Sequence, residues 1–225
     1  MVYRLDRHGD AQGIRLSHER QSPMPPDDDR PRRAKVENAI WTKELFQQAI
    51  REIEHPMLRL GVHLAFATSC REGEMLALTR DCVNLETGRI TINKALKRVT
   101  LESIDHSKDG DVLHVFPQMV PGCKSVLVLA STKTSVVRDA NLTDQLRADI
   151  LDLYAWHDKN RNFYEDYEDN GLLFAQEHGE PVTQNLMSKW FRKFIERSGK
   201  DYPQIPFKNI RHSSATYKVS AEWCR

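Results

Sequence analysis

Between two expected helices the sequence reads Thr68-Ser69-Cys70-Arg71-Glu72-Gly73-Glu74-Met75-Leu76-Ala77-Leu78. Residues 57–68, directly before Ser69, are apolar on most sides, which predicts a buried helix. The residues from Glu72 onward predict a third, short helix with its apolar side chains facing inward. Arg71 therefore falls at the junction of two packed helices, where a rigid scaffold can aim its guanidinium.

Upstream of this stretch the sequence changes character near residue 40. Thr42 is suited to cap a helix whose apolar stripe runs over residues 45–53 and which ends near His55-Pro56. Residues 1–40 carry little apolar periodicity, and residues 22–33 combine prolines with charges, as extended linkers do. The sequence therefore predicts a linker or disordered tail over residues 1–40 and one domain over residues 41–225.

Downstream, the chain alternates between strand and helix signals. Two short apolar runs flank Glu86-Thr87-Gly88 and predict a hairpin, and further strands are expected at residues 112–116, 125–129 and 136–142. The polar segment 94–122 is either a two-stranded insertion or a mobile loop. Helices are expected over residues 143–157 and 183–198 and from about Asn209, with an acidic surface loop over residues 160–170.

Composition limits the classes of function. The chain has 225 residues, 40% of them hydrophobic, and a net charge of +1, so its overall charge does not indicate a nucleic-acid partner. The charge is unevenly spread, however: residues 139–180 hold eleven acids against three bases, and residues 181–225 hold nine bases against three acids. A cationic C-terminal segment suits a polyanion, although such charges also solvate helix surfaces.

Other sites are not indicated by the sequence. The four cysteines show no metal-binding or paired spacing, and no apolar run is long enough to cross a membrane. We therefore expect a soluble cytoplasmic protein with reduced thiols, no bound metal, no cofactor and no membrane contact.

Three cations in distinct settings are the strongest functional signal. They are Arg71, Lys133 in Ser131-Thr132-Lys133-Thr134, and Arg211 in Phe207-Lys208-Asn209-Ile210-Arg211-His212. An arginine presents a flat fork of donors that matches two phosphate oxygens, whereas a lysine is a mobile point charge that can release a proton. Two guanidiniums and an ammonium therefore suit a site that grips one phosphate.

In this order, the three segments resemble the catalytic half of the tyrosine recombinases, the phage integrase family. The first arginine lies in an R-x-G-E pattern that leads into a hairpin, as it does in that family. Residues 207–216 resemble the second arginine box, H-x-x-R-H, with Lys208 in place of the first histidine. The resemblance covers nearly all of the chain from Trp41. It implies an α+β fold, mainly helical, with a small antiparallel β-sheet on one side.

The resemblance also implies roles for individual residues. The expected catalytic residues are Arg71, Lys133, Lys208 and Arg211. Lys133 is expected to be the general acid, with Lys94 and Lys97 as the next candidates. Glu74 is expected to support the arginines and His212 to orient Arg211. Two alternatives remain open: Arg71 and Glu74 as an ordinary pair on a helix surface, and His212 as a structural histidine.

DNA is the implied partner. Arg138, together with Lys189, Arg192 and Lys193 on the basic helix 183–198, is expected to bind double-stranded DNA. Family members recombine and integrate DNA by cleaving and rejoining strands through a phosphotyrosine. Synaptic recombinases of the family act as tetramers, so the full-length parent is expected to be a homotetramer on DNA and this chain alone a monomer.

The attacking tyrosine of that family lies some tens of residues beyond the second arginine. Only fourteen residues follow Arg211, and Tyr217 is the one tyrosine among them. We expect Tyr217 to be a core or helix-surface residue, and the chain to be a catalytic domain that is truncated before its nucleophile and binds DNA without cleaving it. The alternatives are a non-catalytic DNA-binding module derived from an integrase, and a protein-interaction domain whose arginines form surface ion pairs.

Overall fold

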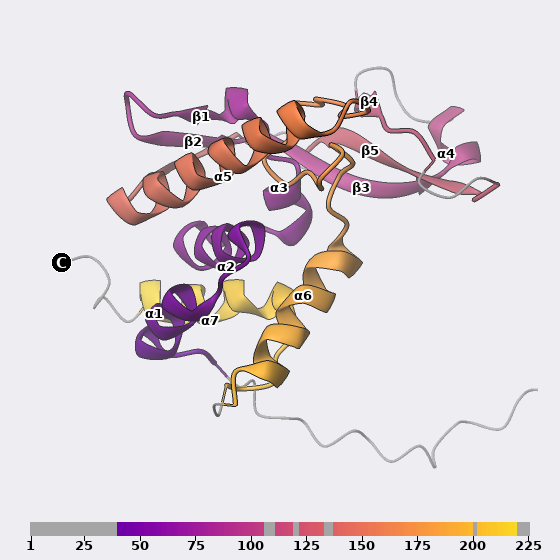
Figure 1. Ribbon diagram of the computed structural model, residues 1–225. Coiled ribbons are helices and arrows are strands. Elements are labelled where there is room, and N and C mark those ends of the chain that lie inside the picture. The colour runs from indigo at the N-terminus through magenta and orange to yellow at the C-terminus, as the bar shows by residue number, and fades with distance from the viewer. Residues whose placement is uncertain (1–39, 106–110, 119–121, 133–136, 200–201, 220–225) are drawn as a thin grey trace, which may run out of the picture. The chain divides into compact units, whose positions relative to one another are not determined.

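The computed structural model describes residues 40–105, 111–118, 122–132, 137–199 and 202–219 (Figure 1). They belong to one compact unit, Ala39–Arg225. The predicted tail, residues 1–40, lies outside the described residues except for its last position. The boundary between tail and domain therefore stays a prediction.

Three of the helices begin where the sequence supplies a hydroxyl cap. The side chains of Thr42, Thr143 and Thr183 each accept a hydrogen bond from the backbone N–H three residues on. Such a cap satisfies one of the N–H groups that a first helical turn leaves without a partner. The helices are α1 (Lys43–Glu52), α2 (Pro56–Thr68), α3 (Glu72–Leu76), α4 (Leu101–Asp105), α5 (Asp144–Phe163), α6 (Gln184–Arg197) and α7 (Ile210–Val219), with short 3-10 turns η1 (Arg80–Cys82) and η2 (Phe207–Asn209).

Helix α5 is longer than the sequence predicts. The helical spacing ends at His157, whereas the helix continues to Phe163. The buried His157 ring explains the extension. Its Nε2 lies 2.8 Å from the carbonyl oxygen of Leu173, and its Nδ1 lies 3.2 Å from the hydroxyl of Tyr167. These contacts hold the last turns of α5 against the following segment, so the expected acidic loop begins after Phe163 rather than at Asn160.

The strands form two antiparallel sheets of three strands each in the described part of the chain. In the first sheet β2 is central, and in the second β5 is central. Ile90 and Ile92 of β2 are buried, whereas Arg89 is exposed, as expected for a strand with one covered face. The strands are β1 (Val83–Asn84), β2 (Arg89–Ile92), β3 (Lys94–Thr100), β4 (Val112–Val115), β5 (Ser125–Ser131) and β6 (Arg138–Asn141).

The polar segment 94–122 proves to be a two-stranded insertion. Both β3 and β4 pair with β5, and the β3 register runs from Lys94 opposite Ser131 to Thr100 opposite Ser125. Strand β5 is covered on both faces. Its Leu127 and Leu129 join the main core, and the alternate residues Val126, Val128 and Ala130 form a second small cluster.

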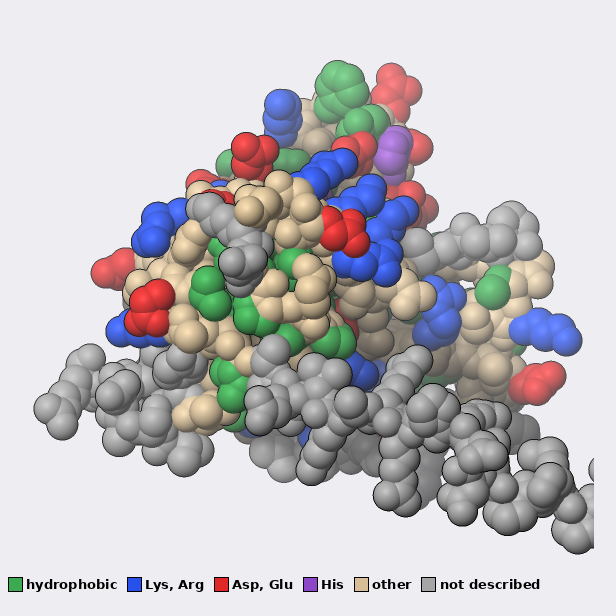
Figure 2. Space-filling view, turned by 90° about the horizontal axis from the view of Figure 1, so that it is seen from below, with side chains coloured by type: hydrophobic (Ala, Val, Ile, Leu, Met, Phe, Trp, Pro, Cys, Tyr) green, Lys and Arg blue, Asp and Glu red, His purple; other side chains and the backbone are tan. Residues whose placement is uncertain are grey.

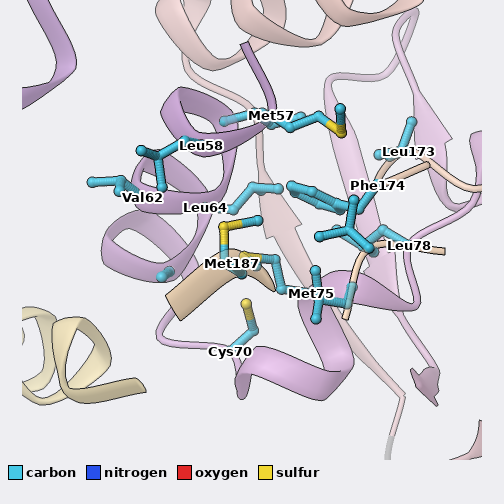
Figure 3. Packing of buried hydrophobic residues seen from close by; sticks show 14 of the residues in the cluster. Met57, Leu58, Val62, Leu64, Cys70, Met75, Leu78, Leu173, Phe174 and Met187 are labelled. Carbon is cyan, nitrogen blue, oxygen red and sulfur yellow. The ribbon is translucent and has the colours of Figure 1, made fainter. Parts of the chain in front are cut away.

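The main core is built around α2, which packs against α5 and α7. Leu64 of α2, Met75 of α3, Phe174 and Met187 of α6 are fully buried and gather in one place (Figure 3). Burying a side chain of this size stabilises the fold by roughly 1.5–3 kcal/mol. Segments far apart in the sequence are thereby fixed relative to α2.

These elements confirm the predicted fold class, a mainly helical α+β domain with small antiparallel sheets. The strands gather on one side of the unit together with α5, and α1, α6 and α7 lie on the other (Figure 1). Within the described residues, no helix combines the length and apolar character needed to cross a bilayer.

Candidate functional site

A cleft of about 920 Å³ brings several of the predicted site residues together. Its walls come from the start of α3, from β3, from the end of β5 and from the segment where η2 leads into α7. The charged and titratable residues that line it are Arg71, Glu72, Glu74, Lys97, Lys208, Arg211 and His212. Of the residues predicted to be catalytic or supporting, Arg71, Glu74, Lys208, Arg211 and His212 thus meet at one place.

Glu74 joins two arginines from different parts of the fold. Its Oε1 accepts a hydrogen bond of 2.8 Å from the Arg71 guanidinium, and its Oε2 accepts one of 2.9 Å from the Arg71 backbone N–H. Oε2 also accepts a hydrogen bond from the guanidinium of Arg138 on β6. Arg71 is therefore not half of an ordinary surface pair, because its partner is buried and shared.

The charge of Glu74 is maintained despite this burial. The side chain is only 6% exposed, and desolvation alone would raise its pKa. The hydrogen bonds from Arg71 and the nearby charges of Arg138 and Arg71 outweigh desolvation and hold the pKa below its usual value. An ionised Glu74 holds Arg71 by its backbone and by one guanidinium nitrogen, while the Arg71 side chain stays 63% exposed and available to a ligand.

Arg211 and Lys208 enter the cleft from the junction of η2 and α7. The peptide dipoles of a helix make its N-terminal end favourable for anions, and both cations lie within one turn of that end. Two buried serines follow them. Ser213 Oγ accepts a hydrogen bond of 3.0 Å from the backbone N–H of Trp41, and Ser214 Oγ lies 2.7 Å from Ser69 Oγ. His212 is exposed at the cleft.

Lys133 lies outside the described residues. The residue before it, Thr132, is buried and lines the cleft at the end of β5. Of the two alternative lysines, Lys97 lines the cleft, with its Nζ 3.3 Å from the carbonyl oxygen of Ser131. Lys94 is instead held outside the cleft lining by Thr79 and Asp81, at 2.7 and 2.9 Å.

The predicted DNA-binding residues of α6 do not line this cleft. Lys189, Arg192 and Lys193 are exposed, and Arg192 lies 3.9 Å from Glu196 on the same helix. Figure 2 shows one face of the unit on which Lys and Arg side chains gather with a few acidic ones among them. The assignment of these three residues and of Arg138 to DNA binding stays a prediction.

Among the cleft residues that the sequence did not single out, two have contacts that shape the site. Gly73 lies so close to β3 that an added Cβ would be 2.9 Å from the carbonyl oxygen of Leu96 and 3.1 Å from Nε2 of Gln184. The glycine thus allows α3 to pack directly on the strand. Its place in the R-x-G-E pattern was the available signal, but spacing alone does not show what a glycine contacts.

Glu72 is the second such residue. Burial raises its pKa to about 7, although a hydrogen bond with Ser188 of α6 and the charge of Lys208 oppose the rise. Its Oε1 is buried and has no hydrogen-bond partner among the described residues. A glutamate beside an arginine at the start of a helix is usually a solvated surface charge. Nothing in the sequence therefore indicates that Oε1 of Glu72 is buried.

Metal ligation is not part of the described site. Across the described ranges, no group of three or more His, Cys, Asp or Glu side chains is arranged to hold a metal ion. The side chain of Tyr217 is outside the described part of the chain. What the cleft offers chemically is a set of guanidinium and ammonium donors on a rigid scaffold, which fits a phosphate group.

Comparisons with known proteins relate the chain to one family. The profile described as "Phage integrase family" matches residues 42–223. A "Tyrosine recombinase XerC-like" protein of Caldanaerobacter subterraneus subsp. tengcongensis is 24% identical over 186 residues, which are 81% of this chain and 44% of that protein. The chain therefore spans about half the length of the relatives it matches.

Solved structures show the same fold. The integrase of transposon Tn1549, in complex with transposon right end DNA, has a TM-score of 0.59 at 16% identity over 88% of this chain and 56% of that one. The XerA recombinase has a TM-score of 0.53 at 14% identity over 82% and 52%. At such identities the likeness extends to the fold alone, and the roles of individual residues depend on the geometry of the cleft.

Proposed function

The chain belongs to the phage integrase family, and we propose from this that it is the catalytic domain of a tyrosine recombinase. Its parent protein carries out site-specific recombination or integration of DNA by cleaving and rejoining strands. The observation that carries the proposal is the meeting of Arg71, Lys208 and Arg211 at one cleft, although the first and last of them are 140 positions apart.

In the proposed mechanism, Arg71 and Arg211 bind the non-bridging oxygens of the scissile phosphate. A tyrosine hydroxyl attacks the phosphorus, a 3′-phosphotyrosine forms and the 5′ oxygen leaves. The arginines neutralise the charge that grows on the phosphate oxygens, and one preorganised donor of this kind contributes roughly 2.7–4 kcal/mol. A second 5′-hydroxyl later attacks the phosphotyrosine and restores the phosphodiester, so the covalent bond conserves the energy of the cleaved one.

Lys133 is the proposed general acid, giving a proton to the leaving 5′ oxygen. Proton transfer of this kind contributes roughly 10²–10⁴-fold to a rate. Lys208 is a further phosphate ligand, because its ammonium donates hydrogen bonds well but is a poorer proton shuttle near pH 7 than the histidine more usual at this position. Glu74 orients Arg71, and His212 lies beside Arg211 at the mouth of the cleft.

The wider surface is proposed to hold the DNA backbone. Lys189, Arg192 and Lys193 are exposed along α6 and would contact phosphates away from the reacting one. We further propose that the full-length parent works as a homotetramer on DNA in the cytoplasm, and that this chain alone is a monomer.

The first test is duplex binding as a function of salt. Arg71→Ala and Arg211→Ala should each weaken binding and lower the slope of log K against log salt by about one. Arg51→Ala is the matched control, since Arg51 is an exposed arginine on α1 that does not line the cleft. Unchanged affinity in both cleft variants would refute the proposal and favour a protein-interaction domain.

A second test separates cleavage from binding. Lys208, in the place of a histidine, favours phosphate binding over proton transfer, which is the specific observation in support of a non-catalytic DNA-binding module. The chain is supplied with a C-terminal helix that carries the attacking tyrosine, incubated with a nicked duplex that traps the covalent intermediate, and then run on a denaturing gel. A DNA-linked band supports the recombinase, whereas salt-sensitive binding without that band supports the binding module.

A further inference from the structure

Glu72 is the one carboxyl lining the described cleft that the proposed mechanism does not use. It is the first residue of α3, yet its side chain forms a hydrogen bond with Ser188 of α6. One of its oxygens, Oε1, is buried without a hydrogen-bond partner among the described residues. A buried ionised oxygen without a donor is costly, so this position favours the neutral carboxyl.

The groups around Glu72 are mostly cationic. Its own segment contributes Arg71 and Glu74, and Glu74 already accepts hydrogen bonds from Arg71 and Arg138. Among the described residues that share the cleft, β3 supplies Lys97, η2 supplies Lys208, α7 supplies Arg211 and His212, and α6 supplies the uncharged Gln184.

Lys208 is the cation whose charge acts on Glu72. Burial raises the Glu72 pKa to about 7, and the ammonium of Lys208 works in the opposite direction. Lys208 is exposed and lines the same cleft as Glu72. The two groups are therefore coupled through space while Lys208 stays free to turn toward a ligand in the cleft.

We propose that Glu72 is a positioning residue that couples phosphate binding to proton uptake: neutral Glu72 leaves Lys208 to the phosphate, and ionised Glu72 attracts Lys208 and repels the phosphate. This inference rests on the proposed function, because it requires the cleft to bind a DNA phosphate. It adds to that function a dependence of DNA affinity on pH that the arginines do not produce.

The direction in which DNA affinity changes with pH follows from the linkage between phosphate binding and proton binding. A bound phosphate is an anion near Glu72, so it raises the pKa of the carboxyl further and the complex takes up a proton. Affinity is then highest below the pKa of the free protein and falls as pH rises through it. If binding raises the pKa by one unit, affinity falls by roughly tenfold between about pH 6 and about pH 8.5.

The experiment measures fluorescence anisotropy of a labelled random-sequence duplex across this pH range at constant ionic strength. Glu72→Gln keeps the shape of the neutral carboxyl, and it should bind at high pH as tightly as at low pH. Glu165→Gln is the matched control, because it removes an exposed acidic charge outside the cleft. That variant should keep the wild-type fall in affinity with pH.

His212 lines the same cleft, so its contribution must be separated from that of Glu72. The comparison is therefore repeated in a His212→Gln background, where Glu72→Gln should still remove a fall in affinity. If the fall persists unchanged in Glu72→Gln, or disappears with His212→Gln alone, the inference is overturned while the proposed function stands. If the wild-type chain binds no duplex at any pH, the proposed function itself fails.

A carboxyl carbon NMR titration gives a readout that does not depend on affinity. The resonance missing from Glu72→Gln identifies the group, and its midpoint is compared with and without the duplex. A midpoint near neutral pH that rises on DNA binding supports the inference. A midpoint in the ordinary carboxyl range, or one that DNA leaves unmoved, overturns it.

Discussion

The hydroxyl oxygens of Ser69 and Ser214 lie 2.7 Å apart and join the two arginine-bearing segments of the cleft. Ser69 ends α2 in a left-handed conformation, with φ of 53°, two residues before Arg71. Ser214 is fully buried in α7, three residues after Arg211. The distance between the two guanidiniums therefore depends on a contact that neither arginine makes itself.

Ser214→Ala should loosen this junction. The change removes one hydrogen bond to Ser69, and we expect the free energy of unfolding to fall by about 1 kcal/mol in urea titrations. Duplex affinity should fall as well, because the two arginines are less well placed. Thr216→Ala is the control: Thr216 is exposed on the same helix and bonds only the carbonyl of His212, so its change should stay within about 0.5 kcal/mol. Equal effects of the two substitutions would contradict this role for Ser214.

Glu74→Gln should destabilise the protein in a pH-dependent manner. The folded-state pKa of Glu74 is depressed, so its charge contributes stability above the ordinary pKa of about 4.3, and that contribution is lost as pH falls below it. Urea midpoints should thus differ between wild type and Glu74→Gln at neutral pH and converge on acidification. A difference that is constant across this range would show that the charge of Glu74 is not what holds the arginines.

Gly73→Ala and Gly61→Ala should have opposite effects, although both replace a helical glycine. The Cβ at Gly73 would meet the backbone oxygen of Leu96 at 2.9 Å, which forces α3 away from β3. We expect a loss of roughly 1–3 kcal/mol and weaker duplex binding. The Cβ at Gly61 would meet the flexible ends of two side chains, Met187 at 3.2 Å and Met75 at 3.5 Å, and alanine favours the helix by up to about 1 kcal/mol. Thermal unfolding of both variants is the measurement, and equal losses would contradict the packing argument.

Lys97 and Lys94 lie on the same strand, but their substitution should have different effects. Lys97 should matter for DNA binding and Lys94 for the stability of the fold. Lys97→Gln removes a cation of the cleft, so it should weaken duplex binding and lower the salt slope by about one. Lys94→Gln removes the partner of Asp81 and Thr79, so it should lower stability and leave the salt slope unchanged. A salt slope that responds to Lys94→Gln rather than Lys97→Gln would place the DNA on the other side of β3.

Glu72→Gln should stabilise the protein at alkaline pH. The folded pKa of Glu72 is about 7, above the ordinary value, so its ionisation opposes folding progressively as pH rises from the ordinary carboxyl range toward 7 and remains unfavourable above it. The variant should be about as stable as wild type at acidic pH and more stable at pH 8. Urea midpoints at the two pH values test this, and a variant that is never more stable would contradict the burial of this carboxyl.

Much of the secondary structure could be predicted because its signals act over a few residues. A threonine such as Thr42 caps the turn that follows it, and the apolar spacing of α2 shows that it is buried on most sides. The identity of the family likewise followed from short patterns around Arg71 and Arg211. For segment 94–122 such signals were insufficient, because a polar strand looks like a loop until its partner, here β5, is known.

The candidate site was only partly accessible to the same reasoning. The sequence by itself determined which cations are present, where the capped helices α1, α5 and α6 begin and that the domain is mainly helical. The tertiary structure decided that Glu74 is shared by Arg71 and Arg138, that one carboxyl oxygen of Glu72 is buried, and that Ser69 meets Ser214. Those two serines are 145 positions apart, so their contact arises from the packing of α2 against α7. Caps and spacings are local properties of a chain, whereas burial and contacts between distant segments exist only after the core has formed.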